Sequence, residues 1–348
     1  MLQKFISTAA LGVALSGAAF AADLPKTHLN IVGNLSFDTA TASFEKPFWT
    51  KTVPEQSGGA IETQFKSFNE MGLKGAEILR LMSQGVIEFG SATLSYFASD
   101  DPIYDAVNLV GMAPTLKDEE AVIDSFTPVY QQILQKKGIH LLGFGINPAQ
   151  VLYCNSNIGK LADIEGKKVR ISSRTQADFV DAMGGSSVNM AFAEVVPALQ
   201  TGVIDCAITG SLSGFNAKWY EVSTHLLELP LNWNPIMYAV NDKAWSKLDP
   251  KVQAFVTTHF SAMLKDLIAD VARQNQEGYD CNSGAAACTA AVKGSMKLVK
   301  PTQEDLDLLK KVAYGTVAPK WGERCSADCV TRFNETVGKM LDFSVAKR

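Results

Sequence analysis

Two blocks of alternating strand-like and helix-like segments limit the folds open to this chain more than any other feature of its sequence. In the first block we expect strands and helices in alternation at residues 28–33, 41–56, 61–65, 74–83 and 86–91. A second block, between Val151 and Ile208, repeats the pattern. Strands that alternate with helices form mainly parallel sheets covered by helices. The sequence therefore predicts an α/β protein with two lobes and no flexible linker between them.

A long helical pattern follows the second block. From Pro250 to about Asp280, apolar residues recur at intervals of three and four. At 1.5 Å per residue such a helix is roughly 40 Å long, enough to lie across both lobes. A helix confined to a bundle in one lobe is the alternative. Residues 281–301 are rich in Gly, Ala and Ser and are expected to form a loop.

The first residues have the pattern of a secretory signal peptide. Lys4 supplies a positive charge, residues 5–20 carry no charge, and Ala19-Phe20-Ala21 fits a cleavage site. A membrane anchor would need about 20 strongly apolar residues, and this stretch contains too much Ala, Gly and Ser. No cysteine lies at the cleavage point, which argues against a lipoprotein. We therefore expect cleavage after Ala21 and an exported protein that is free in an oxidising compartment.

Six cysteines remain after the predicted cleavage. An even number of cysteines in an exported chain favours disulfides, although six allow many pairings. The spacing suggests a bond between Cys154 and Cys206 and two bonds among the last four cysteines, which are Cys281, Cys288, Cys325 and Cys329. Buried free thiols are the alternative. A zinc site has less support, because CxxC pairs and a neighbouring histidine are both lacking, so we expect no metal.

Charge and motif content argue against several classes of function. The formal net charge of -4 and the lack of a basic stripe speak against nucleic-acid binding. The four histidines are isolated in sequence, and none has a metal-binding spacing. A GxSxG elbow and a phosphate-binding glycine loop are lacking too. Carboxylates far apart in sequence could still converge in space, but the sequence favours neither an enzyme nor a cofactor.

One arginine has the setting of a carboxylate-binding residue. Arg170 lies near the end of an expected strand, and a helix is expected to begin just after Ser173. In open α/β sheets, ligands bind beyond the carboxyl ends of strands, where helix N-termini offer free N–H groups and a partial positive charge. A guanidinium group binds a carboxylate through two parallel hydrogen bonds. The residues thus favour a site for a small carboxylate, with a surface salt bridge to Glu165 or Asp163 as the alternative.

Four tracts carry a resemblance to a known family. They are Gly166 to Ser173, Phe192 to Asp205 (FAEVVPALQTGVID), Trp219 to Val222, and Gln84 to Gly90. These tracts resemble the solute-binding component of tripartite ATP-independent periplasmic (TRAP) transporters, the dicarboxylate-binding DctP-type family. The likeness spans nearly the whole chain after the signal peptide, and the tract beginning at Phe192 is its most specific part. The resemblance implies a two-lobe periplasmic binding protein with hinge strands and a long helix that spans the lobes.

The resemblance also implies roles for individual residues. Arg170 falls on the arginine that usually grips the substrate carboxylate in this family. Ser173 falls near a frequent polar contact, and Phe192 falls on an apolar or aromatic pocket wall. Thr209 falls where many members have a pocket asparagine, and Gln150 where many have a second arginine.

The chain departs from the family pattern in ways that bear on the ligand. Residues 205–211 replace a stretch that is commonly DGQEN, and Gln150 lacks the second positive charge. A buried carboxylate needs pairing or several hydrogen bonds, so one arginine in place of two favours a monocarboxylate over a dicarboxylate or sialic acid. Gly210, Ser211 and Trp233 are expected to make room for a larger or more apolar ligand. Trp233 equally fits a residue that packs the lobes together.

Three residues of the first block are further candidates for the pocket. Asn34, Ser91 and Thr93 lie at expected strand ends. Ordinary caps and turns are the alternative interpretation of these side chains.

The expected mechanism is closure of two lobes around a small organic acid, which is then delivered to integral membrane permease subunits. The lobes are assigned to residues 22–147 with 236–275 and to residues 148–235 with 276–348, and the hinges to 147–150 and 234–237. We expect a periplasmic monomer without stable membrane insertion. The alternatives are an ABC-type or tripartite tricarboxylate binding protein, a periplasmic enzyme with a two-lobe cleft, and a sensor subunit. The spacing from Phe192 to Asp205 argues against both the ABC-type and the tripartite tricarboxylate binding protein.

Overall fold

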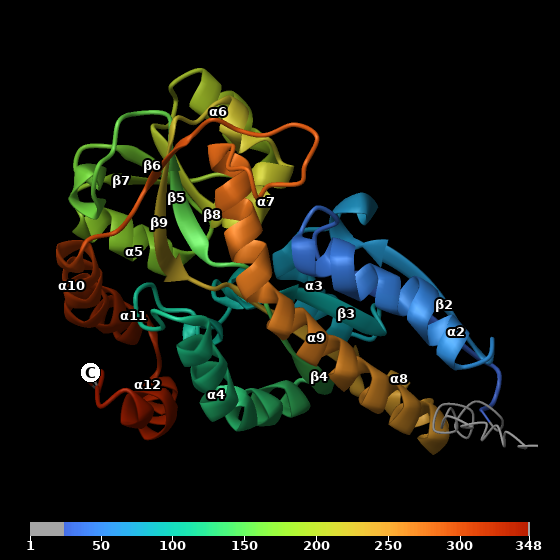
Figure 1. The fold of residues 1–348 in the computed structure, drawn as a ribbon. Coiled ribbons are helices and arrows are strands. Elements are labelled where there is room, and N and C mark those ends of the chain that lie inside the picture. The colour runs from blue at the N-terminus through green and yellow to red at the C-terminus, as the bar shows by residue number, and fades with distance from the viewer. Residues whose placement is uncertain (1–23, 347–348) are drawn as a thin grey trace, which may run out of the picture.

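The computed structural model describes residues 24–346 and divides them into two α/β lobes (Figure 1). The predicted signal peptide and its cleavage site lie outside the described residues. Each lobe is built around one mixed β-sheet with helices on its faces. The predicted α/β class and two-lobe architecture are confirmed.

Lobe 1 contains a five-stranded sheet in the order β2-β1-β3-β10-β4. Its strands are β1 (Thr27–Gly33), β2 (Ile61–Ser67), β3 (Phe89–Thr93), β4 (Ile139–Ile146) and β10 (Pro235–Asn241). β1 is parallel to β2 and β3, whereas β10 runs antiparallel to β3 and β4. The first predicted block therefore forms the parallel part of the sheet, and a strand from much later in the chain is inserted next to β3.

Lobe 2 contains a six-stranded sheet in the order β11-β9-β5-β8-β6-β7. Its strands are β5 (Gln150–Cys154), β6 (Lys168–Ile171), β7 (Ser186–Asn189), β8 (Cys206–Gly210), β9 (His225–Asn232) and β11 (Lys297–Val299). β6 is parallel to β7 and β8, and β5 is antiparallel to β8 and β9. β11 lies within residues 281–301, so the expected loop contains a strand that is too short to show a periodic pattern.

Helices and single helical turns connect the strands. The helices are α2 (Val53–Gln56), α3 (Gly75–Ser83), α4 (Leu116–Lys136), α5 (Arg174–Ala182), α6 (Val195–Gln200), α7 (Ser211–Asn216), α8 (Asp242–Lys247), α9 (Pro250–Ser283), α10 (Gln303–Val312), α11 (Ala318–Arg324) and α12 (Ala327–Phe333). The helical turns are η1 (Thr41–Glu45), η2 (Phe48–Thr52), η3 (Phe68–Met71), η4 (Leu94–Phe97), η5 (Pro102–Asp105), η6 (Leu161–Ile164), η7 (Phe192–Glu194), η8 (Trp219–Glu221), η9 (Ala313–Val317) and η10 (Asn334–Gly338). Together, η1, η2 and α2 account for the helix expected at residues 41–56.

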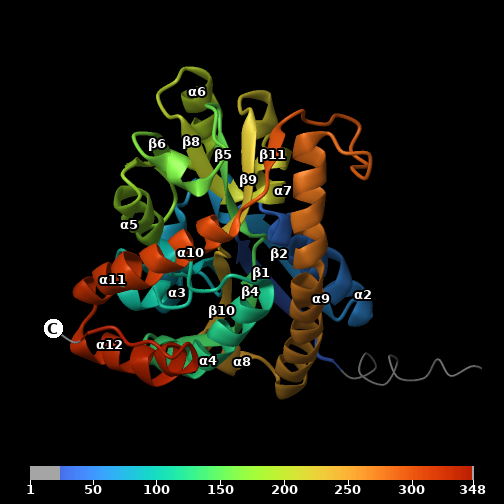
Figure 2. The ribbon, with the colours of Figure 1, turned by 60° about the vertical axis from the view of Figure 1, so that its left-hand side comes forward.

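The long helix α9 runs along both lobes, as Figures 1 and 2 show. Its 34 residues correspond to about 50 Å. It contacts β4 and η1 of lobe 1 and α7, β9 and β11 of lobe 2. Gly278 permits the close contact with α7, because a side chain there would lie 2.5 Å from the Leu212 backbone nitrogen. The predicted helix therefore spans both lobes, and the alternative of a helix confined to one lobe is wrong.

Two further segments cross between the lobes, at the predicted hinges. Residues 147–149 join β4 to β5, and residues 233–234 join β9 to β10. The Asn147 side-chain amide donates a hydrogen bond of 3.2 Å to the Asn234 backbone carbonyl and so ties the two crossings together. Asn234 has a φ of 56°, in the left-handed region that asparagine adopts more readily than most residues.

The C-terminal helices contact both lobes. η9 packs against α5 of lobe 2, whereas η10 packs against α4 of lobe 1. The Trp321 indole donates a 2.7 Å hydrogen bond to the Pro102 carbonyl of lobe 1. The Arg324 guanidinium lies 2.6 Å from the Asp178 carboxylate of lobe 2. Residues 303–338 therefore connect the two lobes and do not simply extend the second.

Three disulfides link the six cysteines: Cys154–Cys206, Cys281–Cys288 and Cys325–Cys329. These bonds confirm the predicted pairing of Cys154 with Cys206 and the two disulfides predicted among the last four cysteines. Cys154 and Cys206 face each other across the antiparallel strands β5 and β8. The pairing leaves none of the described cysteines free.

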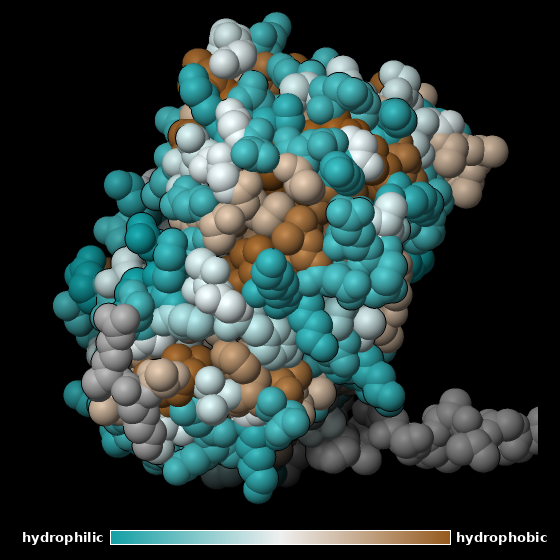
Figure 3. All heavy atoms as spheres, turned by 90° about the vertical axis from the view of Figure 1, so that its left-hand side faces the viewer, coloured by the Kyte–Doolittle hydropathy of each residue, from teal (hydrophilic) through white to brown (hydrophobic). Residues whose placement is uncertain are grey.

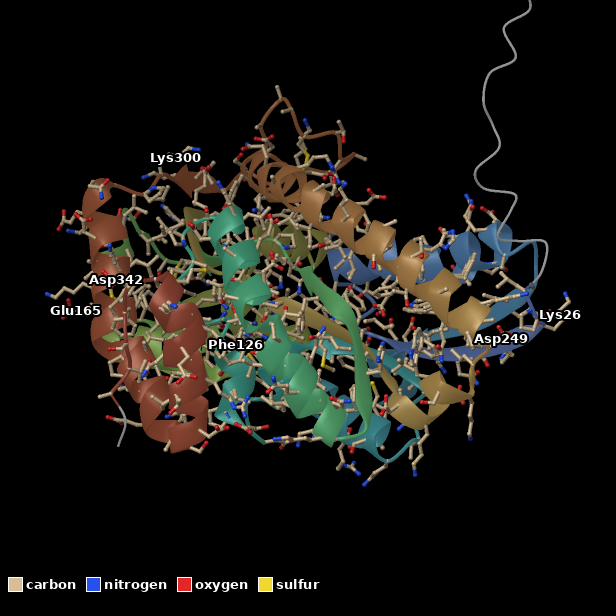
Figure 4. All side chains as sticks on the ribbon, turned by 90° about the horizontal axis from the view of Figure 1, so that it is seen from below. Lys26, Phe126, Glu165, Asp249, Lys300 and Asp342 are labelled. Atoms are coloured by element: carbon tan, nitrogen blue, oxygen red, sulfur yellow. A yellow bond between two sulfur atoms is a disulfide. The ribbon has the colours of Figure 1, made fainter. Side chains whose placement is uncertain are left out.

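The molecule is elongated. Lys26 and Asp249 lie at the lobe 1 end, whereas Glu165 and Lys300 lie at the opposite end (Figure 4). On the face seen in Figure 3, hydrophilic residues surround several smaller hydrophobic areas. Within residues 24–346, every helix falls short of the length or apolarity that a membrane crossing requires.

Candidate ligand-binding site

A cleft of about 1060 Å³ lies between the two lobes. From lobe 1 it is lined by Leu35 and Phe37, which follow β1, and by Tyr96, which follows β3. From lobe 2 it is lined by residues at the end of β6, at the start of α5 and after β7. The cleft is therefore bordered by the carboxyl ends of parallel strands in both sheets, the usual place for a ligand in open α/β folds.

Arg170 is the central charged residue of this cleft. It is the third residue of β6 and only 5% exposed. Its Nε donates to the Met190 carbonyl at 3.0 Å, and its Nη1 donates to the Ile208 carbonyl at 2.9 Å. These two carbonyls hold the guanidinium in a fixed orientation, and Nη2 has no acceptor among the described residues.

The charge of Arg170 is not neutralised by the protein. Within residues 24–346, every carboxylate lies beyond ion-pair distance from it, so the predicted alternative of a surface salt bridge to Glu165 or Asp163 is wrong. Burial lowers the pKa of Arg170 to about 10, and the nearby Tyr96 hydroxyl opposes that change. The guanidinium therefore stays charged at neutral pH. A buried charge without a counter-ion is costly, and an anionic ligand would remove this cost.

Ser173 caps the helix that follows β6. Its hydroxyl accepts a 3.3 Å hydrogen bond from the Gln176 backbone amide at the start of α5. The Gln176 side chain in turn accepts a 2.8 Å bond from the Ser172 amide. Ser173 thus lines the cleft while it also fixes the N-terminus of α5, whose partial positive charge favours an anion.

Phe192 forms an aromatic wall that both lobes share. Its ring stacks on Phe37 of lobe 1, with centroids 4.6 Å apart, and on Trp219 of lobe 2, with centroids 5.1 Å apart. The Arg170 guanidinium carbon lies 6.0 Å from the Phe192 ring centroid. Phe37 remains 37% exposed, so the stack lies at the edge of the cleft, where it joins the two lobes.

Phe37→Ala is expected to raise the dissociation constant of a cleft-bound ligand by about 3- to 10-fold, since an aromatic pair contributes about 0.5–1.5 kcal/mol. Because the substitution removes the Phe37–Phe192 stack from the closed state, most of the change in affinity should lie in the dissociation rate of the ligand. Stopped-flow fluorescence measures this rate directly. Phe37→Tyr keeps the stack and serves as the matched control. An unchanged dissociation rate in Phe37→Ala would contradict a role for the stack in closure.

The other residues of lobe 2 and the hinge that were predicted to bind the ligand do not line the cleft. Gln150 donates its side-chain amide to the Pro148 carbonyl at 3.1 Å. Thr209 is buried on β8, next to Gly210 at the start of α7. The Ser211 hydroxyl donates to the Asn275 carbonyl of α9 at 3.3 Å. The Trp233 indole donates to the Ala113 carbonyl at 2.9 Å. This contact agrees with the alternative prediction that Trp233 packs the lobes together.

The three lobe 1 candidates are buried: Asn34 directly follows β1, Ser91 is the middle residue of β3, and Thr93 is its last residue. Asn34 donates its side-chain amide to the Asp38 carboxylate at 3.0 Å. The Ser91 hydroxyl donates to the buried Glu45 carboxylate. Thr93 ends β3 and precedes the turn that carries Tyr96. None of the three is part of the cleft lining.

A chain of amides between the lobes was not predicted. Gln176 of lobe 2 donates to Asn232 at 3.1 Å, and Asn232 donates to Asn108 of lobe 1 at 2.7 Å. Asn108 also accepts from the Asn234 backbone amide at 3.1 Å and donates to Ser95 at 2.8 Å. These residues come from four separate segments, and no local pattern marks them.

Comparison with protein families gives one match over most of the chain. The model of bacterial extracellular solute-binding protein, family 7 (DctP), matches residues 40–312. The chain belongs to this family.

Two relatives and one solved structure show the sequence distance between this family 7 protein and others. The C4-dicarboxylate-binding periplasmic protein DctP of Rhodobacter capsulatus is 25% identical over 263 residues, which cover 73% of this chain and 75% of the relative. An uncharacterized protein of Haemophilus influenzae is 24% identical over 210 residues, covering 59% of this chain and 63% of that protein's length. The solved structure of DctP6, a Bordetella pertussis extracytoplasmic solute receptor binding pyroglutamic acid, has a TM-score of 0.77 at 21% identity, covering 88% of this chain and 98% of that chain.

Family membership confirms the resemblance drawn from the sequence and the assignment as a solute-binding protein. Family 7 consists of extracellular solute-binding proteins and is not an enzyme family. Its description as extracellular agrees with an exported chain. The fold shared with DctP6 is the two-lobe architecture described above.

Proposed function

We propose that this protein captures a small organic acid in the cleft between its lobes, with Arg170 as the anchor of the ligand carboxylate. The observation that carries the proposal is the unpaired charge of Arg170, which is 5% exposed and faces a cleft of about 1060 Å³. A carboxylate placed there would accept from the free side of the guanidinium in the bidentate geometry that arginine favours. It would also lie near the N-terminus of α5.

The preferred ligand class is a monocarboxylate. The other two arginines of the cleft wall, Arg174 and Arg324, are already paired with Asp178 at 3.8 and 2.6 Å. Gln150 provides no charge where many relatives have a second arginine. A second buried carboxylate would therefore have no cation to pair with, and its desolvation would oppose binding. The Bordetella receptor binding pyroglutamic acid, itself a monocarboxylate, shows that the same fold accommodates this class.

We further propose that the closed, ligand-bound form docks on integral membrane permease subunits and releases the acid for uptake. The protein acts as a periplasmic monomer after cleavage following Ala21, with neither cofactor nor metal and without catalysing a reaction. The family match supports this role in transport. Closure is expected to occur about residues 147–150 and 234–237, where two of the chain segments cross between the lobes.

A thermal-shift screen of the purified protein tests the proposal. The panel contains hydroxy and keto monoacids, aromatic acids, sugar acids, amino acids and dicarboxylates. A ligand at about 100 times its dissociation constant adds about 2.7 kcal/mol to stability, which we expect to raise the melting temperature by a few degrees. Shifts with dicarboxylates alone would contradict the monocarboxylate preference. Unchanged melting with every acid, after dialysis from denaturant to remove any co-purified ligand, would contradict the proposed function.

A further inference from the structure

One tyrosine of lobe 1 lines the ligand cleft and has a hydroxyl hydrogen that the protein does not use. Tyr96 belongs to η4, which directly follows β3. The Thr93 side chain lowers the pKa of Tyr96, as a donor to the phenolic oxygen does. Among residues 24–346, no group accepts a hydrogen bond from the Tyr96 hydroxyl itself. This hydroxyl is therefore free to donate to a ligand in the cleft.

The position of the Tyr96 ring is fixed without the hydroxyl. Gly75, the first residue of α3, allows the ring to lie against the backbone, because a Cβ atom there would lie 2.1 Å from a ring carbon. The Phe68 ring contacts Tyr96 edge-on, with ring centroids 6.3 Å apart. Both Gly75 and Phe68 also line the cleft. Removal of the hydroxyl should therefore leave the aromatic ring in place.

At neutral pH the Tyr96 hydroxyl is an uncharged donor that lies within electrostatic reach of Arg170. Burial raises the pKa of Tyr96 to about 12, and the charge of Asp38 adds to this increase. The Arg170 guanidinium acts in the opposite direction, and Tyr96 in turn acts on the pKa of Arg170. The two side chains come from opposite lobes and line the same cleft. A carboxylate bound to Arg170 would therefore lie close to the Tyr96 hydroxyl.

The other polar side chains that line the cleft from lobe 1 are already engaged or are exposed. They are Asn69, Ser95, Ser99 and Asp105. Asn69 donates to the Ser36 hydroxyl and accepts from the Ser36 backbone amide, both at 3.0 Å. Ser95 accepts from Asn108 at 2.8 Å and hydrogen-bonds to the Asp105 carboxyl group. Ser99 is exposed. Tyr96 is thus the described side chain through which lobe 1 can donate to a buried ligand.

A carboxylate bound to Arg170 needs a further donor. The guanidinium donates through Nε to Met190 and through Nη1 to Ile208, which leaves Nη2 and the second Nη1 hydrogen for a ligand. A carboxylate accepts about four hydrogen bonds. A buried carboxylate that lacks some of them loses the free energy that water would have supplied. A donor from the opposite lobe would meet this requirement.

We propose that the Tyr96 hydroxyl donates a hydrogen bond to the carboxylate that Arg170 holds, so that one group of the ligand is bound by both lobes. This inference rests on the proposed function, because it takes the Arg170-bound acid as given. Arg170 and Tyr96 can contact the same carboxylate only when the lobes are closed, so the carboxylate itself favours closure. Tyr96 is then a specificity-determining residue that selects for the ionised acid.

A double-mutant cycle measured by isothermal titration calorimetry tests this role. The probe is the monocarboxylic acid that raises the melting temperature most in the thermal-shift panel. Tyr96→Phe is expected to raise its dissociation constant about 10-fold or more, because a hydrogen bond to a charged group is lost. In the Arg170→Lys background the same substitution is expected to raise it by less than about 3-fold, because lysine no longer fixes the carboxylate beside the hydroxyl. Tyr220→Phe removes a hydroxyl from η8, outside the cleft lining, and should bind the acid as the wild type does.

The outcomes separate this inference from the proposed function. Wild-type affinity in a folded Tyr96→Phe protein would overturn the inference, whereas the proposed function would stand. Equal fold-changes in the wild-type and Arg170→Lys backgrounds would also overturn it, because the hydroxyl would then act independently of the carboxylate. If none of the acids binds the wild-type protein, the proposed function fails and this inference fails with it.

A crystal structure of the wild-type complex gives a second readout that needs no variant. We expect about 2.5–2.7 Å between the Tyr96 Oη and a carboxylate oxygen of the bound acid. A separation above about 3.5 Å would overturn the inference even if Tyr96→Phe does not fold.

Discussion

Replacing Arg170 by alanine is expected to weaken binding of the organic acid by about 100-fold or more. The substitution removes the only unpaired cation found among the described residues that line the cleft, and a buried charge pair loses about 2–5 kcal/mol when one partner is truncated. Calorimetry with the acid identified in the screen measures the loss. Arg170→Lys should give an intermediate affinity, because lysine keeps the charge but loses the planar fork that fits a carboxylate.

The folding of the Arg170→Ala protein provides the necessary control. The wild-type guanidinium is a buried charge without a counter-ion, so its removal should leave a cooperative melting transition in the absence of ligand. Lys168→Ala changes an exposed cation on the same strand and should bind the acid as the wild type does. Wild-type affinity in a folded Arg170→Ala protein would contradict the assigned role of Arg170.

Removing the Cys154–Cys206 disulfide by a double substitution to alanine is expected to lower the free energy of unfolding by about 4 kcal/mol. This value follows from the entropy of a loop closed by cysteines 52 residues apart. Both cysteines are fully buried on the neighbouring strands β5 and β8, so the cavity left by the two sulfur atoms would add to the loss. Urea denaturation monitored by circular dichroism gives the change in stability.

The disulfide Cys281–Cys288 offers a matched comparison. Its cysteines are only seven residues apart, and the same relation gives a loss of about 2 kcal/mol. The two double variants should therefore differ clearly in their denaturation midpoints. If both lost the same stability, loop entropy would not explain the contribution of the longer-range bond.

The features predicted correctly from the sequence were those coded by neighbouring residues. Arg170 and Ser173 lie three residues apart, at the end of one strand and the start of the next helix, so their positions could be predicted from the local sequence. The spacing of apolar residues predicted almost the full extent of α9. Helix α4 is absent from the expected elements, although Thr115 and Asp118 form a capping box at its start that could have revealed it.

Features that depend on distant residues were not accessible from the sequence. The Asn232 side chain donates to Asn108, which lies 124 positions earlier in the chain. Ser91 was expected at the pocket, but the alternation of side chains along β3 directs it towards Glu45 on the helix-covered side. Ser211 bonds to Asn275 because α9 packs there, a contact that no local pattern specifies.

A crystal structure of the protein with the acid identified in the screen tests the central claim most directly. We expect electron density for the ligand between the lobes, with its carboxylate oxygens about 2.7–2.9 Å from the Arg170 guanidinium nitrogens. A ligand whose carboxylate is bound elsewhere in the cleft, or a ligand in the groove of about 590 Å³ between α4 and α9, would contradict it.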